Sequence, residues 1–304
     1  FNPGRPDLPD GGYSDRVKYR MIKVTIHEVG HNFFPMIVNS DERQWTWMDE
    51  GLNSYMEMLA ELDYDKDFPI VRGYPKNIVK YMAGDQSTIA PIMSKGDHVY
   101  SFGANAYGKP ATALWILRET IMGKELFDHA FKTYSQRWMF KHPTPADFFR
   151  TMEDASGIDL DWFWRGWFYT TDVTDIGIKG VKKYYTKDAG DAVEFVKDTS
   201  KGLGFAKKQN KYHYEITYNK PGGLVMPIIV EFTYKDGTKE KKTYPAQIWR
   251  YNDKEVTKVF SSSKQIESIM IDPDLETADV DTSNNSFPKE KSSKFDKFKN
   301  KMKG

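Results

Sequence analysis

The sequence predicts an α+β protein in which a mostly helical part precedes a smaller antiparallel β part. Apolar residues recur at helical spacing up to about residue 170, and alternating, β-branched segments follow them. A lysine-rich stretch then closes the chain. We expect an irregular lead-in over 1–14, a helical domain over 15–176, a β-sandwich over 177–281 and a basic, disordered tail over 282–304.

Composition restricts the classes of function. The 304 residues include 44 Lys and Arg against 43 Asp and Glu, so no net charge favours nucleic acid or an acidic membrane surface as a partner. Cysteine is absent, which excludes disulfides and leaves the redox compartment and the localisation open. Any metal must therefore bind to His, Asp or Glu. No apolar run approaches the roughly 20 residues of a membrane-spanning helix.

Helical periodicity and end signals predict seven helices in the first part. Ser14 suits the N-cap of the first helix, which is expected over 15–38. Pro35 should end or kink that helix. The second is expected over 45–62, after a polar loop. The other five are expected over 71–82, 111–122, 125–138, 145–155 and 160–168.

Short strands separated by turns are expected after the boundary near residue 176. Asp236-Gly237, between two alternating segments, is a strong hairpin signal. Several short strands with intervening turns are typical of a small sandwich. The clearest strands are expected over 212–218, 226–234, 241–251, 257–260 and 266–271.

The chemically informative residues begin with His27-Glu28-Val29-Gly30-His31 and continue with Glu50, nineteen residues after His31. Residues four apart lie on one face of a helix, so both imidazoles can bind one ion while Glu28 lies beside it. Glu50 can supply a third ligand. Asn53, Ser54 and Glu57 share its helix face, but only one residue of that face need contact the metal. Two histidines and one carboxylate leave a fourth position for water, the arrangement of a catalytic zinc site.

The zinc interpretation competes with an ordinary structural one. Histidines on a helical stripe are more often core residues than ligands. Here, however, they flank Glu28, which would otherwise be an unpaired buried charge and therefore costly. One zinc ion lowers the pKa of its water to roughly 7, and Glu28 can take the proton while the ion polarises a carbonyl. Hydrolysis of a peptide bond is the natural outcome, with a tyrosine hydroxyl available for the developing negative charge.

These motifs resemble those of the gluzincin aminopeptidases of the aminopeptidase N and leukotriene-hydrolase type. Trp47-Met48-Asp49-Glu50-Gly51 is similar to the family's Trp-x-Asn-Glu-Gly, and Tyr107-Gly108-Lys109-Pro110 is similar to Tyr-x-Lys-Gly. The resemblance covers residues 15–170 and implies a thermolysin-like catalytic domain with a peptide substrate. It also implies that Tyr107, which spacing alone does not distinguish among eighteen tyrosines, stabilises the tetrahedral intermediate. Asp49 and Pro110 depart from the family's Asn and Gly.

One family motif is missing. The Gly-x-Met-Glu-Asn strand, whose glutamate holds the substrate's free amine, does not occur in this sequence, and the resemblance places it before Phe1. We therefore expect an upstream N-terminal domain that this piece lacks. The predicted function is a zinc-dependent aminopeptidase. A thermolysin-like endopeptidase, which needs no amine anchor, and an inactive truncated or binding domain of such a peptidase are the alternatives.

Overall fold

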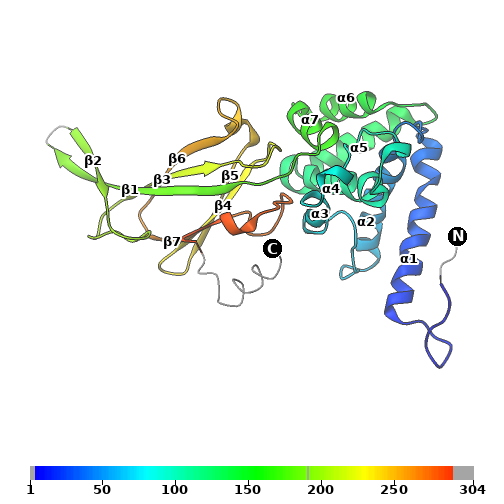
Figure 1. Ribbon diagram of the computed structural model, residues 1–304, viewed down its shortest axis with the longest axis horizontal. Coiled ribbons are helices and arrows are strands. Elements are labelled where there is room, and N and C mark those ends of the chain that lie inside the picture. The colour runs from blue at the N-terminus through cyan, green and yellow to red at the C-terminus, as the bar shows by residue number, and fades with distance from the viewer. Residues whose placement is uncertain (1–3, 190–191, 290–304) are drawn as a thin grey trace. The chain divides into compact units, whose positions relative to one another are not determined.

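The computed structural model describes residues 4–189 and 192–289 and confirms the predicted α+β fold (Figure 1). The chain divides into two compact units. The first comprises Phe1–Val173 and Leu275–Val280, and the second comprises Thr174–Asp274 and Asp281–Gly304. Helices make up the first unit and antiparallel strands the second. No helix in the described ranges is long and apolar enough to cross a membrane.

The first helix, α1, spans Asp15–Gly30, and the Ser14 hydroxyl accepts a hydrogen bond from Val17 N as its N-cap. It ends earlier than predicted because Pro35 and the extended backbone at Phe34 interrupt the following turn, η1. The second predicted helix begins as a wider turn, η2, and continues as α2. The bounds of these and the later elements are η1 Asn32–Ile37, η2 Trp47–Gly51, α2 Leu52–Tyr64, α3 Pro75–Met82, η3 Gln86–Thr88, η4 Gly96–His98, η5 Gly103–Gly108, α4 Lys109–Ile116, η6 Leu117–Ile121, α5 Lys124–Trp138, α6 Pro145–Ser156 and α7 Asp161–Tyr169.

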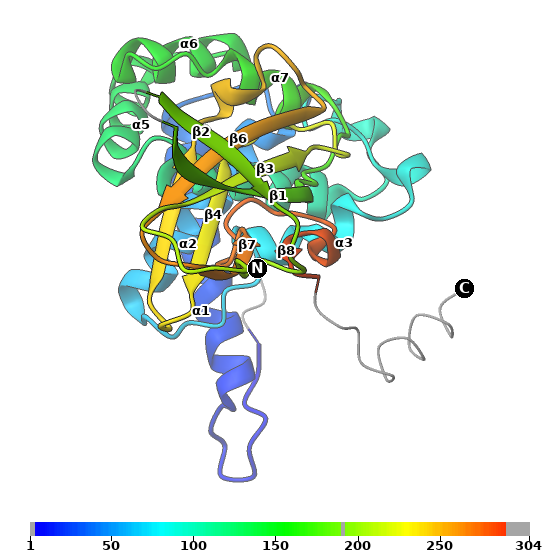
Figure 2. The ribbon, with the colours of Figure 1, turned by 90° about the vertical axis from the view of Figure 1, so that its left-hand side faces the viewer.

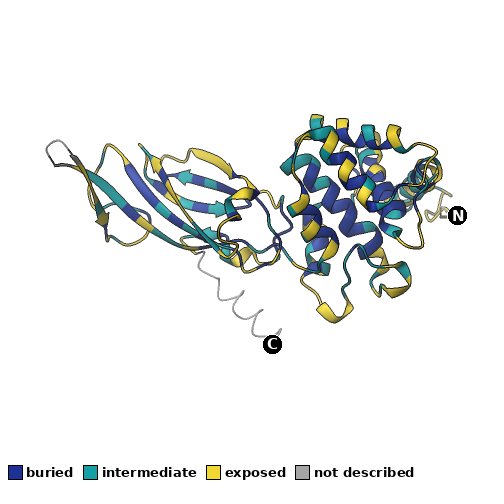
Figure 3. Cartoon of the chain, turned by 90° about the horizontal axis from the view of Figure 1, so that it is seen from above, coloured by how far each residue is buried: buried dark blue, intermediate teal, exposed yellow. Residues whose placement is uncertain are grey.

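Aromatic side chains form much of the core of the helical unit. Trp47 is fully buried, and its ring centroid lies 4.8 Å from that of Phe168 and 5.7 Å from that of Phe148. Figure 3 shows buried residues concentrated on the inner faces of these helices. Because Trp47 precedes Glu50 in η2, this packing fixes the segment that carries Glu50. In contrast, α1 lies at the edge of the unit (Figure 2), and none of its side chains is buried.

The second unit contains two four-stranded antiparallel sheets within the described residues, in the orders β2-β1-β3-β6 and β5-β4-β7-β8. Gly237 has φ +82°, and it lies in the turn between the paired strands β4 and β5, as the hairpin signal predicted. The strands are β1 Gly177–Ala189, β2 Ala192–Asp198, β3 Tyr212–Asn219, β4 Ile228–Tyr234, β5 Lys239–Tyr244, β6 Glu255–Ser262, β7 Ile266–Ile271 and β8 Ser286–Phe287.

Two predictions for this unit need correction. The strand expected over 241–251 ends at Tyr244, because Pro245 has no N–H to donate and a short helical turn, η7 (Ala246–Trp249), follows it. The disordered tail expected from residue 282 is wrong at its beginning. Thr282–Asn284 forms the turn η8, and β8 pairs with β7. The rest of the predicted tail, over 290–304, lies outside the described residues.

Candidate active site

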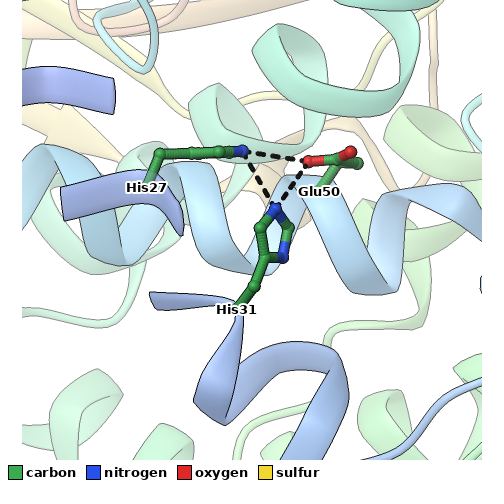
Figure 4. Close-up of side chains that lie close together, drawn as sticks. All are labelled: His27, His31 and Glu50. Atoms are coloured by element: carbon green, nitrogen blue, oxygen red, sulfur yellow. Dashed lines mark hydrogen bonds and ion pairs between the residues drawn. The ribbon is translucent and has the colours of Figure 1, made fainter. Parts of the chain in front are cut away.

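The three predicted metal ligands converge in the helical unit, and Figure 4 shows their side chains directed toward one another. His27 Nε2 lies 3.1 Å from Glu50 Oε2, His31 Nε2 lies 3.3 Å from the same oxygen, and the two Nε2 atoms are 3.1 Å apart. A tetrahedral ion with bonds of about 2.1 Å holds its ligand atoms about 3.4 Å apart. The donor types and their spacing therefore fit a metal ion such as zinc.

A buried glutamate on α2 orients His27. Glu57 Oε2 lies 2.8 Å from His27 Nδ1, and its other oxygen lies 2.5 Å from Lys23 Nζ. Burial works against the ionised carboxyl of Glu57, but the hydrogen bond with His27 and the charge of Lys23 outweigh it and lower its pKa. Burial likewise opposes the charged form of His27, yet Glu50 and Glu57 raise its pKa to about 9. With Nδ1 engaged by Glu57, Nε2 faces the ligand cluster.

Two oxygen atoms lie close to Nδ1 of His31. Its Nδ1 lies 2.9 Å from the carbonyl oxygen of Phe34 and 2.9 Å from Asp49 Oδ1. Burial, helped by the neighbouring charge of Glu50, raises the pKa of Asp49 to about 7. Asp49 thus contacts a ligand histidine from the position where the family pattern has asparagine. Both histidines use Nδ1 for orientation and keep Nε2 for the site.

A glycine allows α1 to approach α2 closely. A Cβ on Gly30 would lie 2.0 Å from Asn53 Oδ1. Asn53 is fully buried, and its Nδ2 donates to the carbonyl oxygen of His27 at 2.8 Å. The carbonyl oxygen of His27, a candidate ligand on α1, is therefore hydrogen-bonded to α2.

Glu28 follows His27 on α1 and is exposed, so the expectation of a buried charge at this position is wrong. Within the described residues it makes no hydrogen bond or ion pair. A buried carboxylate at Glu28 therefore does not support a zinc site, whereas the convergence of the His27, His31 and Glu50 side chains does. The Glu28 carboxylate is available to accept a proton.

Tyr107 lies in η5, and its hydroxyl donates to Glu50 Oε1 at 2.5 Å. Burial and this hydrogen bond raise the pKa of Tyr107, so the hydroxyl keeps its proton. Pro110, which replaces the family's glycine, lies in the first turn of α4, where a missing N–H costs little. A Cβ on Gly51 would lie 2.6 Å from Pro110 Cγ, so the two segments are in tight contact. Pro110 thus packs the Tyr107 segment against the Glu50 segment.

The structure therefore brings together four of the five predicted site residues, His27, His31, Glu50 and Tyr107, and leaves Glu28 beside them on α1. Glu57 was not predicted to orient a ligand, although its place seven residues after Glu50 set it on the same helix face. Asp49 was noted only as a departure from a motif. A buried lysine, Lys109, is a further feature near Tyr107. Its Nζ donates to the carbonyl oxygen of Thr170 at 3.2 Å, and burial lowers its pKa to about 8.

This combination of a helical unit, a His-Glu-x-x-His helix and a downstream glutamate defines a metallopeptidase type of fold and site. The Peptidase family M1 domain matches residues 8–167, more than half of the chain, and the chain belongs to this family.

Curated relatives carry aminopeptidase names. Leucine aminopeptidase 2 of Emericella nidulans is 28% identical over 163 residues, which cover 49% of this chain and 26% of that protein. Human glutamyl aminopeptidase is 24% identical over 174 residues, which cover 55% of this chain and 18% of that protein. The chain thus spans about a quarter or less of the length of these relatives.

A solved structure shares the fold. Legionella pneumophila aminopeptidase A, crystallised in complex with aspartic acid, superimposes with a TM-score of 0.58 at 13% sequence identity. The similarity covers 91% of this chain and 28% of that one. It therefore extends over both the helical and the β parts.

Proposed function

We propose that this chain carries the metal site of a zinc-dependent aminopeptidase. The observation that carries the proposal is the convergence of His27 Nε2, His31 Nε2 and Glu50 Oε2, with the Tyr107 hydroxyl bonded to the same carboxylate. Membership of peptidase family M1 and the aminopeptidase names of its relatives support the reaction class. The substrate is a peptide with a free amino terminus.

His27, His31 and Glu50 would hold one zinc ion. When bound, the ion polarises the scissile carbonyl and lowers the pKa of water in the site. Glu28 is exposed and accepts the proton that the attacking water loses. The same carboxyl then returns the proton to the nitrogen of the leaving amine, so that Glu28 is unchanged after each turnover.

Tyr107 acts on the oxygen of the scissile carbonyl, which becomes negatively charged when water adds to the carbon. Its raised pKa keeps the proton on the hydroxyl, as a hydrogen-bond donor requires. One donor aimed at such an oxygen lowers the barrier by about 3 kcal/mol. The half-buried position of Tyr107 and the contact between Gly51 and Pro110 keep this donor near Glu50.

Substitution of Glu28 tests the proposal, because Glu28→Gln keeps the size of the side chain and removes the proton acceptor. Zinc content, measured by atomic emission, should stay at one ion per chain, while hydrolysis of an aminoacyl-anilide should fall at least about 1,000-fold. Glu125→Gln is the matched control, because Glu125 is exposed in the first turn of α5. Cleavage by Glu28→Gln at the parent rate would falsify the assignment.

The amino-terminal specificity has its own test. Peptides with a free amine and their N-acetylated forms differ only at the group that an aminopeptidase recognises. The proposal expects cleavage of the free forms alone. Equal cleavage of both forms would instead identify an endopeptidase, with the same residues around the zinc.

A further inference from the structure

A half-buried arginine lies beside the candidate site without an anionic partner. The Cζ atom of Arg72 lies 4.5 Å from the centroid of the Tyr107 ring, so the guanidinium covers that ring. Across residues 4–189 and 192–289, no carboxylate lies within ion-pair distance of it and no hydrogen bond engages its N–H groups. A guanidinium offers five donors in a fixed plane, and at a half-buried position these are expected to be used.

The loop that carries Arg72 is fixed on both sides. Gly73 has φ +100°, and a Cβ there would lie 2.2 Å from Met58 Sδ, so only glycine fits this turn against α2. On the other side, Asn77 Nδ2 donates to the carbonyl oxygens of Ile70 and Val71 at 3.3 and 3.1 Å. The backbone thus holds the guanidinium beside Tyr107, and little conformational entropy is lost when it binds an anion.

Two acidic residues of the site, Glu50 and Asp49, are engaged elsewhere. Glu50 accepts from Tyr107 through one oxygen and faces His27 and His31 with the other. Asp49 lies against His31 at 2.9 Å. Neither carboxylate is therefore free to neutralise Arg72, which retains its charge for a group that enters the site.

We propose that Arg72 is a specificity-determining residue that binds a carboxylate of the peptide substrate. The proposal rests on the proposed function, because that function places the scissile carbonyl at His27, His31 and Glu50. A guanidinium pairs with a carboxylate through two parallel N–H···O hydrogen bonds, which an amide cannot match. The carboxylate belongs either to an acidic side chain next to the scissile bond or to the carboxyl terminus of a short peptide.

Binding to a variant that does not turn over separates this proposal from catalysis. In a Glu28→Gln background, calorimetry compares Ala-Gln-Ala amide, which has no carboxylate, with Glu-Ala-Ala amide, Ala-Glu-Ala amide and Ala-Gln-Ala free acid. Arg72→Gln removes the charge, and Arg72→Lys keeps the charge but loses the planar pair of donors. Lys76→Gln is the matched control. Lys76 is an exposed cation of the adjacent helix α3, and its Nζ lies 5.7 Å from the Tyr74 ring.

Without the Arg72 substitution, at least one carboxylate peptide should bind about 10- to 100-fold more tightly than Ala-Gln-Ala amide. Arg72→Gln should remove that advantage and leave the affinity for Ala-Gln-Ala amide within about twofold of its value before the substitution. Arg72→Lys should keep part of the advantage, and Lys76→Gln should keep all of it. The peptide that loses affinity identifies the source of the carboxylate. Equal weakening of all four peptides, or no advantage before Arg72 is changed, overturns the proposal.

Measurements of hydrolysis, rather than of binding, show whether the proposed function is wrong. If the parent chain does not hydrolyse peptides, or if Glu28→Gln still does, the assignment of the reaction is wrong. The first of these outcomes leaves the binding comparison among the four peptides unaffected, because calorimetry needs no turnover. A loss of carboxylate preference in Arg72→Gln can therefore be observed even when no turnover is measured.

Discussion

The ligand atoms at the site are held by side chains that do not themselves contact the metal position. His27 depends on Glu57, which is shared with Lys23, while His31 depends on Asp49 and the carbonyl oxygen of Phe34. A carboxylate on Nδ1 fixes the tautomer of an imidazole and makes its Nε2 a stronger ligand. Zinc affinity is therefore expected to depend on these partners.

Substitution of Glu57 tests this dependence. Glu57→Gln removes the charge that orients His27 and should weaken zinc binding about 10- to 100-fold, measured by competition with a chromophoric chelator. Glu61→Gln is a matched control, because Glu61 is buried on the same helix and pairs with Lys23 at 3.4 Å without contacting His27. An equal loss in both variants would mean that the effect comes from α2 as a whole.

Substitution of Tyr107 tests the proposed role of its hydroxyl as a hydrogen-bond donor in catalysis. Tyr107→Phe removes one oxygen and keeps the ring that lies under Arg72, so zinc content should stay constant. The turnover number should fall about 100- to 1,000-fold, because one donor to the developing negative charge is lost. Tyr100→Phe is the control, since Tyr100 is 86% exposed. Full activity of Tyr107→Phe would remove this residue from the mechanism.

Residue spacing was enough to associate His27 with His31, because four residues make about one turn of a helix. It was also enough to assign Glu50 to the same candidate metal site, because Glu50 lies in the next predicted helix. It could not assign Glu57, Asp49 or Arg72. Their partners are set by how α1, α2 and the loop before α3 pack, and no local pattern in the sequence encodes those distances. Exposure of Glu28 was missed for the same reason.

At the scale of elements, α1 carries the candidate ligand His27, has the candidate ligand His31 as its C-cap residue, and yet has no buried side chain. Polar interactions join it to α2: Asn53 donates to the carbonyl oxygen of His27, Glu57 contacts the His27 ring, and Lys23 pairs with Glu57 and Glu61. A metal ion bound by His27, His31 and Glu50 would add a direct link from α1 to η2. The stability of α1 should then depend strongly on the metal.

Metal removal tests this dependence by hydrogen exchange. A chelator should speed the exchange of amide protons in α1 more than in α4, since seven of the eight residues of α4 are buried. The zinc-loaded chain supplies the reference, and mass spectrometry of peptides from each helix gives the measurement. The same increase in both helices would indicate that the metal stabilises the whole unit rather than α1.

Helix ends were predictable where a local signal marks them. Thr144 and Asp147 form a capping box at the start of α6, and Gly157 ends it in the left-handed region with φ +68°. The failures lie where backbone geometry depends on tertiary contacts. The first helix ends at Gly30, before Pro35, where its end or kink was expected, and β5 ends before Pro245, which leads into a turn that buries Trp249. Apolar content extended both predictions too far.

At the scale of the whole molecule, the two units have separate cores, and the second contains a buried ion pair. Lys183 Nζ lies 3.5 Å from Asp198 and donates to the hydroxyl and carbonyl oxygens of Ser200 at 2.7 and 2.9 Å. Burial raises the pKa of Asp198, but hydrogen bonds from Ser200 and Ala206 and the charge of Lys183 outweigh it and lower the pKa to about 2. The candidate metal ligands His27, His31 and Glu50 all belong to the other unit.

At acid pH the pair of Lys183 and Asp198 should no longer contribute to the free energy of unfolding. Because the pKa of Asp198 falls from 3.8 to about 2 on folding, its stabilising effect is complete above pH 3.8 and is lost as the pH falls toward 2. Asp198→Asn should therefore lower the free energy of unfolding by about 3 kcal/mol at pH 7, and by less in acid. Urea denaturation at several pH values measures this, with Asp253→Asn, at an exposed position, as the control. An unchanged free energy of unfolding in Asp198→Asn at pH 7 would contradict this prediction.

The contact between Gly51 and Pro110 has a consequence for how this site can be altered. Gly51 follows Glu50, and Pro110 comes three residues after Tyr107, so the ligand and the hydroxyl donor are joined through these two residues. A side chain at position 51 would collide with the proline ring unless position 110 became smaller at the same time. A side chain can therefore be introduced at position 51 only together with a change at position 110. Attempts to redesign the chemistry should treat the turns at η2 and η5 as a single unit and exchange them together.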